Sequence, residues 1–172
     1  MADDATMTIS AVILPDEIAK TLASQTYVYT PADTTEGWYY KIVDVTTTST
    51  DLISTETFLQ KGTTSAGVDT GSTMPAVTTS DEIKFLFIKH TGKRDDGTTN
   101  NTADSVYVCF DAGTAAHNLA DAIEIGPSEC WFGKLSGATV AQIHCISGAK
   151  AGAGTGGNKI QCIVAAVIDD VS

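Results

Sequence analysis

The last part of the chain, from Asp104 to Ser172, constrains the fold most strongly. It contains four apolar segments rich in β-branched residues, and each one is bounded by Gly, Pro, Ser or Asn: VYVCFDAG, AIEIGPSECWFGKL, ATVAQIHCISGAK and NKIQCIVAAVIDDV. Short apolar runs between turn residues are typical of antiparallel β-strands. No catalytic constellation accompanies them. This region therefore predicts an all-β antiparallel fold with a binding or structural role, and we expect the protein not to be an enzyme.

Length and composition favour one folded domain. A chain of 172 residues is long enough to bury roughly two-thirds of its unfolded surface without disulfides. Its 42% hydrophobic and 18% charged residues exclude a wholly disordered chain. We expect an N-terminal arm with a short helix over residues 1–30 and a single β-sandwich domain over residues 31–172.

The charge is strongly negative and uneven. The formal net charge is -11, and residues 1–86 hold twelve acidic side chains against four lysines. Acidity disfavours binding to nucleic acid or to an anionic membrane surface. The acidic N-terminal half either meets a basic partner or keeps the surface soluble.

The first residues do not resemble a targeting segment. The opening MADDATMTIS is acidic where a secretory signal is basic, and the apolar AVIL ends at Pro15. We therefore expect the chain to be made and kept in a reducing cytoplasm. The four cysteines lack CxxC spacing, so free thiols are expected.

The N-terminal arm shows two local patterns. Apolar residues alternate with polar ones over residues 6–13, where Ile9 and Ile13 share one parity, and this predicts a strand. Pro15 followed by Asp16 and Glu17 predicts the first turn of a short helix, because proline and acidic residues suit that helix end.

The middle of the chain contains two strong strands and one long loop. Residues 37–45, GWYYKIVDV, are rich in aromatic and branched residues. Residues 83–88 are apolar on both faces, as in a sandwich core or a subunit contact. Gly62 to Ser80 is small, polar and rich in glycine, and is either a functional excursion or a mobile segment. Residues 90–104 are expected to form a polar turn region.

Residue parity indicates which C-terminal strands are covered on both sides. Ala141, Ile143 and Cys145 share one parity, which leaves Gln142 and His144 on the other face. Over residues 160–168 both parities are apolar, with Ile163, Ala165 and Val167 on the second face. Cover for that second face comes either from another subunit or from the chain's own loops and helix.

No motif predicts a catalytic, cofactor or metal site. The glycine-rich residues 152–157 precede a strand, whereas a phosphate-binding loop precedes a helix. His90, His117 and His144 lack metal-site spacing, and we place them on a loop, a loop and a strand. Asp95-Asp96-Gly97 lacks the alternating oxygen ligands of a calcium loop and is expected to be a solvated turn.

Two aromatic clusters allow another function. Trp38, Tyr39 and Tyr40, together with Trp131 and Phe132, could form a sugar-stacking platform. Such clusters more often fill a β core or an oligomer contact. A carbohydrate-binding module therefore remains open as an alternative.

The C-terminal pattern also resembles a known group of proteins. Residues 106–135 are followed by TVAQIHCISGAKAG and by a closing IQCIVAAVIDD, an order similar to that of virion proteins of tailed bacteriophages. The likeness is to small β-sandwich decoration, or cement, proteins of phage heads. Its motifs are IGPSECW at residues 125–131 and IHCIS at residues 143–147. Some neck and tail proteins of the same viruses share them.

This resemblance implies a jelly-roll-like domain, a homotrimer, and binding to the major capsid protein on the outer face of the head. The protein would then be made in the host cytoplasm and located on the capsid surface. A neck, tail or fibre-attachment protein is the alternative within the virion. The arm from Met1 to Pro15 is one candidate contact. The candidate subunit or capsid contacts are Ile9, Ile13, Trp38, Tyr40, Trp131, Phe132, Ile163 and Val167.

Overall fold

The structure is a computed structural model that describes residues 5–9, 25–29, 36–54, 59–60, 77–111, 113–117, 119–149 and 157–169. The chain divides into two compact units, Met1–Thr34 and Thr35–Ser172. Within the described ranges, regular structure consists of strands and one short 3-10 turn, and every strand pair is antiparallel. The prediction of an all-β antiparallel fold is confirmed.

The described residues of the smaller unit form one strand pair. Strand β1 (Ala5–Ile9) pairs antiparallel with β2 (Gln25–Tyr29), so that Ala5 lies opposite Tyr29. The strand predicted over residues 6–13 is found as far as Ile9. Ile13 and the helix predicted after Pro15 lie outside the described residues.

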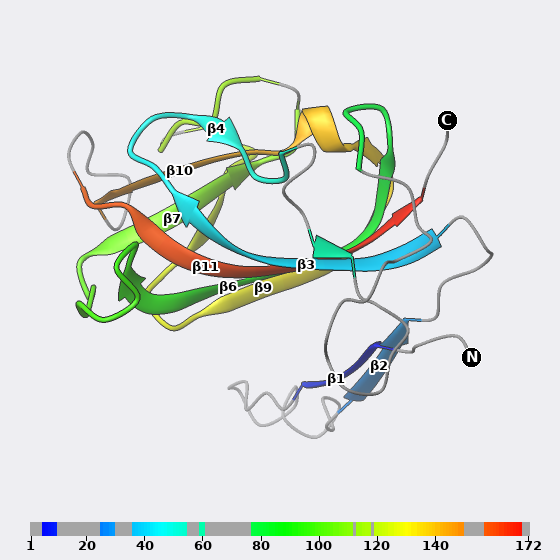
Figure 1. Ribbon diagram of the computed structural model, residues 1–172, viewed down its shortest axis with the longest axis horizontal. Helices are drawn as coiled ribbons and strands as arrows, with labels where there is room; N and C mark the ends of the chain where they lie inside the picture. Colours follow the sequence, from blue (N-terminus) through cyan, green and yellow to red (C-terminus); the bar gives the residue numbers. More distant parts are fainter. Residues whose placement is uncertain are drawn as a thin grey trace, which may run out of the picture. The chain divides into compact units, whose positions relative to one another are not determined.

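The larger unit contains a five-stranded sheet in the order β5-β3-β11-β6-β9. The bounds of its strands are β3 Glu36–Val45, β5 Leu59–Gln60, β6 Glu82–Arg94, β9 Cys130–Thr139 and β11 Ile160–Asp169. The last strand of the chain, β11, lies between β3 and β6, as Figure 1 shows. Segments far apart in sequence therefore form the centre of this sheet.

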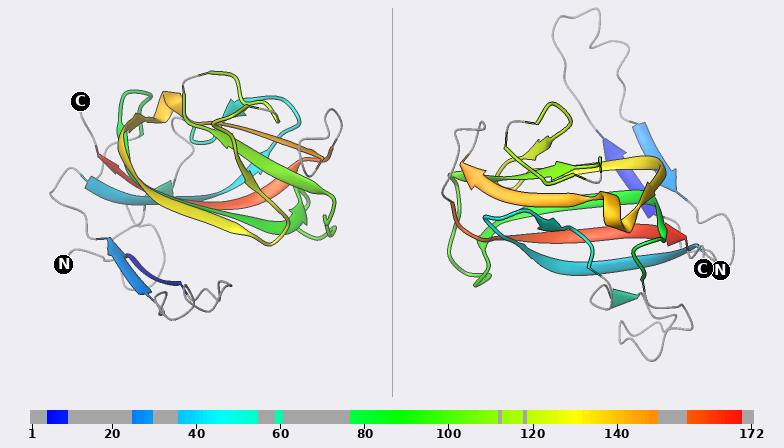
Figure 2. Two further views of the ribbon diagram at one scale, coloured as in Figure 1. Left: turned by 180° about the vertical axis from the view of Figure 1, so that it is seen from behind. Right: turned by 90° about the horizontal axis from the view of Figure 1, so that it is seen from above.

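The second sheet of the larger unit has four strands in the order β4-β10-β7-β8. Their bounds are β4 Thr50–Asp51, β7 Asp104–Cys109, β8 Ile123–Ile125 and β10 His144–Ala149. The 3-10 turn η1 (Val140–Gln142) connects β9 of the first sheet to β10 of the second. The left view of Figure 2 shows the two sheets as separate layers.

One hydrophobic core lies between these layers. Val106, Val108 and Cys145 from the four-stranded sheet belong to the same buried cluster as Ile88 and Val164 from the five-stranded sheet. Alternate residues of β11 face this core, and Ile160, Cys162, Val164, Ala166 and Ile168 are all fully buried. Period-two alternation thus directs one parity of β11 inward, and the larger unit is a sandwich-like pair of sheets.

The structure corrects two details predicted from the sequence. Strand β6 continues to Arg94, so His90 lies in a strand and is fully buried instead of lying in a loop. Pairing of Cys162 with His90 and of Ile160 with Arg94 extends the strand into the polar region. Ala141 is exposed, because turn η1 interrupts the alternation before Ile143 and Cys145, which are buried.

None of the helical structure in the described ranges has the length and hydrophobicity of a membrane-spanning helix. Most of the glycine-rich segment 152–157 lies outside those ranges, and so does most of the long loop predicted from Gly62 to Ser80. Asp95-Asp96-Gly97 forms a solvated turn in which Asp96 Oδ1 accepts hydrogen bonds from the Thr98 and Thr99 amides at 2.8 and 2.7 Å. The Thr99 hydroxyl also donates to Asp96 Oδ2, and this bond, followed by those from the Thr99 and Thr98 amides, lowers the pKa of the Asp96 carboxyl.

Candidate functional site

Apolar side chains cover the side of the five-stranded sheet that faces away from the core. We call this surface the outer apolar face. Its members alternate with the core residues on β3, β11, β6 and β9, and they are Trp38, Tyr40, Ile42, Phe85, Phe87, Phe132, Ile163, Ala165 and Val167. A sheet with water on its outer side normally carries polar residues there, so this apolar composition requires an explanation.

The strand register arranges the face in three rows. One row runs from Ile42 through Ile163 to Lys89 and Cys130. The next row is Tyr40, Ala165, Phe87 and Phe132, and the third is Trp38, Val167, Phe85 and Lys134. Directly opposed side chains in a sheet lie about 4.5–5.5 Å apart at Cβ, so each row is continuous.

The first two rows expose the most apolar surface. Tyr40 is 41% exposed, Ile42 58% and Ile163 40%, and in the described part of the larger unit these are the large hydrophobic side chains with the greatest exposure. Phe87, Ala165 and Phe132 beside them are half-buried. In the third row Trp38 packs edge-on against Phe85 at a ring separation of 5.8 Å, and Val167 is fully buried. The exposed part of the face is therefore contiguous.

Charged side chains lie along the margins of the face. On the β3 margin, Glu36 and Asp44 have the same parity as Trp38 and Ile42. On the opposite side, Lys134 ends the third row, and Lys89 lies next to Cys130 in the first row; both lysines are exposed. At one end of the face, Glu36 shares a row with the acidic Asp169 and Glu82, so the charges around the face are mixed.

One end of the face carries a local ion-pair cluster. Lys84, at a bulge in β6, contacts Glu82 and lies 3.2 Å from Asp169 Oδ2 of β11. The hydrogen bond to Glu82, followed by the one to Asp169, raises the pKa of Lys84 against the effect of burial. The charge of Lys84 is therefore paired within the chain.

The outer side of the four-stranded sheet is covered by the chain itself. Tyr107, Cys109 and Ile146 form a second buried cluster with Ala115, which lies on the segment between β7 and β8. The Tyr107 hydroxyl donates to the Ala149 carbonyl at 2.8 Å, and the His117 ring packs edge-on against Tyr107 at 5.1 Å. In Figure 1 this segment passes over the layer of β4, β7 and β10.

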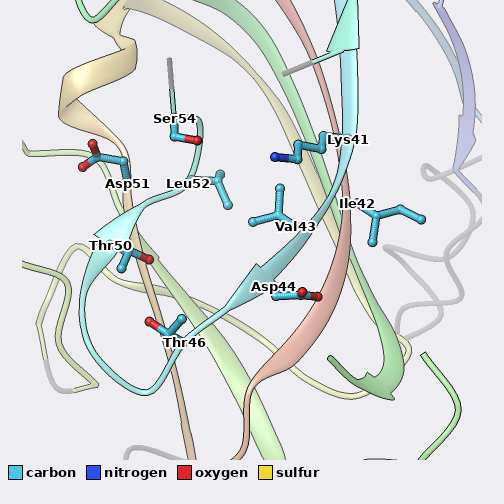
Figure 3. A pocket seen from close by; sticks show the side chains of 9 residues that line it. All are labelled: Lys41, Ile42, Val43, Asp44, Thr46, Thr50, Asp51, Leu52 and Ser54. Atoms are coloured by element: carbon cyan, nitrogen blue, oxygen red, sulfur yellow. The ribbon is translucent and has the colours of Figure 1, made fainter. Parts of the chain in front are cut away.

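A pocket of about 610 Å³ opens at the side of the sandwich, between β3 and β4. Figure 3 shows Val43 and Leu52 pointing into it from the two sides, whereas Ile42 points away. Lys41, Asp44 and Asp51 line it, and Asp51 Oδ1 lies 3.1 Å from Nδ1 of His144. Strand β5 pairs with β3 at Tyr39 and Tyr40, so the described backbone of β3 beyond Tyr40 forms a sheet edge beside this pocket.

A buried polar cluster fastens β6 to β7. The Gly92 amide donates to Nδ1 of His90 at 2.9 Å, so the ring is neutral, and its Nε2–H donates to the Asp104 carbonyl at 3.1 Å. Burial lowers the pKa of His90. Burial also opposes ionisation of the Asp104 carboxyl, but hydrogen bonds from Asn158 and Asn101 hold its pKa below the usual value. This arrangement is structural.

The four cysteines are free, and three are buried. Burial raises the pKa of the Cys109, Cys145 and Cys162 thiols, that of Cys145 to about 12, so these groups are poor nucleophiles. Cys130 is exposed at the end of a row on the outer apolar face. Among the described side chains, no group of three His, Cys, Asp or Glu residues has the geometry of a metal site.

The predicted contact residues fall into three groups. Trp38, Tyr40, Phe132 and Ile163 lie together on the outer apolar face. Trp131 lies on the core side of β9, where its ring is 5.4 Å from Phe110, and Val167 has the outer parity but is buried. Ile9 lies in β1, and its side chain and the whole of Ile13 are outside the described set.

The same geometry separates the five aromatic residues considered as a sugar-stacking platform. Tyr39 is 2% exposed and belongs to the core, as Trp131 does in part, whereas Trp38, Tyr40 and Phe132 face outward. Sequence reasoning missed Ile42 and Phe87 as members of the face. Ile42 shares the parity of Trp38 and Tyr40, so extending that parity along residues 37–45 would have found it.

Comparison with known proteins adds no assignment: no protein-family model, curated protein or solved structure matches this chain.

Proposed function

We propose that this chain is a structural protein of a tailed-bacteriophage virion, namely a capsid decoration protein that binds the outer surface of the head lattice and stabilises it. Its partners would be the major capsid protein and further copies of itself, as a homotrimer. The finer fold belongs to the same proposal: a jelly-roll arrangement of the two sheets, preceded by a short N-terminal helix.

The observation that carries the proposal is the outer apolar face. Tyr40, Ile42 and Ile163 form an exposed apolar surface on a sheet whose other side already packs on the core. Contiguous exposed apolar surface of this kind marks a site of protein association. A virion subunit, whose free energy of interaction goes into contacts with neighbouring subunits, requires such a surface.

Two features of the sequence support the choice of a virion. The IGPSECW and IHCIS segments resemble decoration proteins. The first runs from the last residue of β8 through the turn into β9, and the second from Ile143 into β10. The net charge of -11 disfavours adhesion to packaged DNA. Several weak contacts made at once by an oligomer bind a lattice tightly, because each added contact becomes intramolecular.

Binding to purified, undecorated phage heads tests the proposal. Titration to saturation distinguishes a decoration protein, expected in on the order of hundreds of copies on a repeating lattice, from a neck or tail protein, expected in about a dozen or fewer at a unique vertex. Saturable binding in the higher range, with increased resistance of the heads to heat, supports the proposal. No binding, or saturation at about a dozen copies, contradicts it.

A carbohydrate-binding module is the second candidate, because Trp38, Tyr40 and Phe132 lie on one outward face. Aromatic rings exposed on a sheet can stack against sugar rings. Glycan-array binding that is lost in Tyr40→Ala and kept in Trp131→Phe would favour this candidate, since Trp131 lies on the core side.

A further inference from the structure

We infer that the pocket between β3 and β4 accepts an extended segment of a partner protein, which adds to the edge of β3 as an antiparallel strand. The segment carries a basic residue, two apolar residues and an acidic residue, in that order. This site is separate from the outer apolar face. No phage head enters its test, so failure of this site and failure of the proposed function are distinguishable.

The backbone of β3 itself lines this pocket. Four consecutive residues, Lys41 to Asp44, are in its lining, although successive side chains of a strand point to opposite faces. Ile42 points away from the pocket (Figure 3), so what these residues share there is the strand edge. Among the described residues, β3 beyond Tyr40 pairs with β11 alone. Every second residue of this edge therefore directs its N–H and C=O toward the pocket, where an added strand can bind them.

The opposite wall of the pocket is the edge of the second sheet. Thr50, Asp51 and Leu52 line it consecutively, and β4 is the outermost strand of the four-stranded sheet. Val43 and Leu52 point into the space between the two edges (Figure 3). The volume of about 610 Å³ lies within the range of about 300–1,000 Å³ for ligand sites, and four residues of an added strand span about 14 Å. The pocket thus has room for a short extended chain against an apolar centre.

The side chains along the edge determine which sequence fits. Directly opposed residues of an antiparallel pair lie on the same face and interact. Lys41 and Val43 share the inward parity of the buried Val45, so they select an acidic and an apolar residue. Ile42 and Asp44 have the outward parity and are exposed, so they select an apolar and a basic residue. Along the added strand, which runs opposite to β3, the order is basic, apolar, apolar and acidic.

The charges disfavour a second copy of β3 as the added strand. A two-fold axis normal to the sheet pairs two β3 strands so that opposed residues have the same parity. Lys41 then has no opposed acid, because the acidic residues of β3, Glu36 and Asp44, have the other parity. Inward-pointing charge on an edge strand prevents edge-to-edge pairing of this kind. The occupant is therefore a different sequence, bound by strand addition, in which main-chain bonds supply affinity and alternate side chains supply specificity.

Fluorescence polarisation of two capped peptides with the full chain tests the site. Thr-Lys-Val-Ile-Glu has the inferred order, and Thr-Glu-Val-Ile-Lys has the two charges exchanged; the fluorophore is at the amino end, past Asp44 and away from β5. The first peptide is expected to bind one to one, and about tenfold more tightly than the second, because both opposed charge pairs become repulsive in the second. Lys41→Glu/Asp44→Lys is expected to exchange the preference. The control Asp95→Lys/Lys159→Glu, which reverses an exposed ion pair and also keeps the net charge, retains it.

Hydrogen exchange resolved by residue tests whether binding occurs by strand addition. Within residues 41–45, the alternate amides that do not bond to β11 are expected to exchange at least about tenfold more slowly with the first peptide than without it. This protection, with the exchanged preference of the double variant, supports the inference. It is overturned if neither peptide binds or if the double variant keeps the wild-type preference. It is also overturned if these amides are already protected in the free chain, as they would be if residues 55–58 occupied the edge. Thermal unfolding of each variant establishes that it folds.

Discussion

The outer faces of the two sheets in the larger unit carry similar side chains but different cover. Over the four-stranded sheet, Tyr107 and Ile146 are buried beneath the segment that contains Ala115 and His117. Over the five-stranded sheet, Tyr40 and Ile163 remain at least 40% exposed. An apolar sheet face is stable only when something removes it from water. The first face is covered within the chain; on the second, Phe85 and Val167 are buried, and we propose that association covers the exposed part.

Two cysteines provide the most sensitive test of this difference. Cys109 lies in the covered cluster and is fully buried, whereas Cys130 lies at the end of a row on the other face and is exposed. At concentrations where the chain is dissociated, a thiol reagent is expected to modify Cys130 at least about a thousandfold faster than Cys109, which reacts only after the structure opens. Mass spectrometry of the labelled peptides measures both rates. Similar rates would show that the covering segment does not protect its sheet.

Removal of one tyrosine from each face compares their contributions to stability. Tyr107→Ala empties a buried site and is expected to lower the free energy of unfolding by about 3–5 kcal/mol. Tyr40→Ala removes a ring that is 41% exposed, and a loss below about 1 kcal/mol is expected for the dissociated chain. Denaturant titration at low protein concentration measures both values. Equal losses would contradict the difference in cover.

Substitutions that add methyl groups test whether there is free space above each outer sheet face. A Cβ atom at Gly148 would lie 2.1 Å from Nε2 of His117, so Gly148→Ala must displace the His117 ring from its place against Tyr107, at an expected cost of about 1–3 kcal/mol. Ala165→Val adds two methyl groups to the other outer face and is expected to leave the stability of the dissociated chain within about 0.5 kcal/mol. Thermal unfolding distinguishes them. A cost at Ala165 equal to that at Gly148 would indicate cover on both faces.

Acid is expected to lower the free energy of unfolding through His90, a buried side chain that links β6 to β7. Because burial lowers the pKa of His90 below its ordinary value of 6.5, the unfolded chain binds a proton at pH values where the folded chain does not. The free energy of unfolding is therefore expected to fall as the pH decreases below about 6.5, and to keep falling until the pH reaches the pKa of His90 in the folded chain. Above about pH 6.5, neutral His90 makes its full contribution to stability.

In His90→Gln this component of the pH dependence is absent, so the difference in stability between pH 7.5 and pH 5 is expected to shrink. Denaturant titrations at the two pH values measure the difference. An unchanged pH dependence in the variant would show that His90 does not contribute. The carboxyl of Asp104, whose pKa is lowered from 3.8, titrates below pH 5 and does not affect the comparison between pH 7.5 and pH 5.

Local sequence patterns predicted the strands well and the faces only in part. The aromatic and branched run at residues 37–45 corresponds to β3, and the two apolar parities of residues 160–168 correspond to β11. Parity assigns residues to opposite faces, but it does not say which face packs on the core. Trp131 and Phe132 illustrate this limit, because the register of β9 against β6 decides which of the two faces outward.

Non-local pairing explains the remaining differences. The placement of β11 between β3 and β6 joins segments more than about 60 residues apart in sequence, and nothing in the local pattern specifies it. The burial of His90 follows from that pairing, since β11 extends β6 beyond its apolar run. Likewise, the rows of the outer apolar face are recognisable only once the strand order is known.

The molecular mass of the chain in solution tests the central claim most directly. Light scattering at micromolar concentration is expected to give a multiple of 17.9 kDa for the wild type. Ile42→Asp, which places a charge where the side chain is 58% exposed, is expected to give 17.9 kDa, whereas Thr47→Asp at the exposed turn after β3 keeps the multiple. A wild-type mass of 17.9 kDa, or an Ile42→Asp mass equal to that of the wild type, would contradict the account.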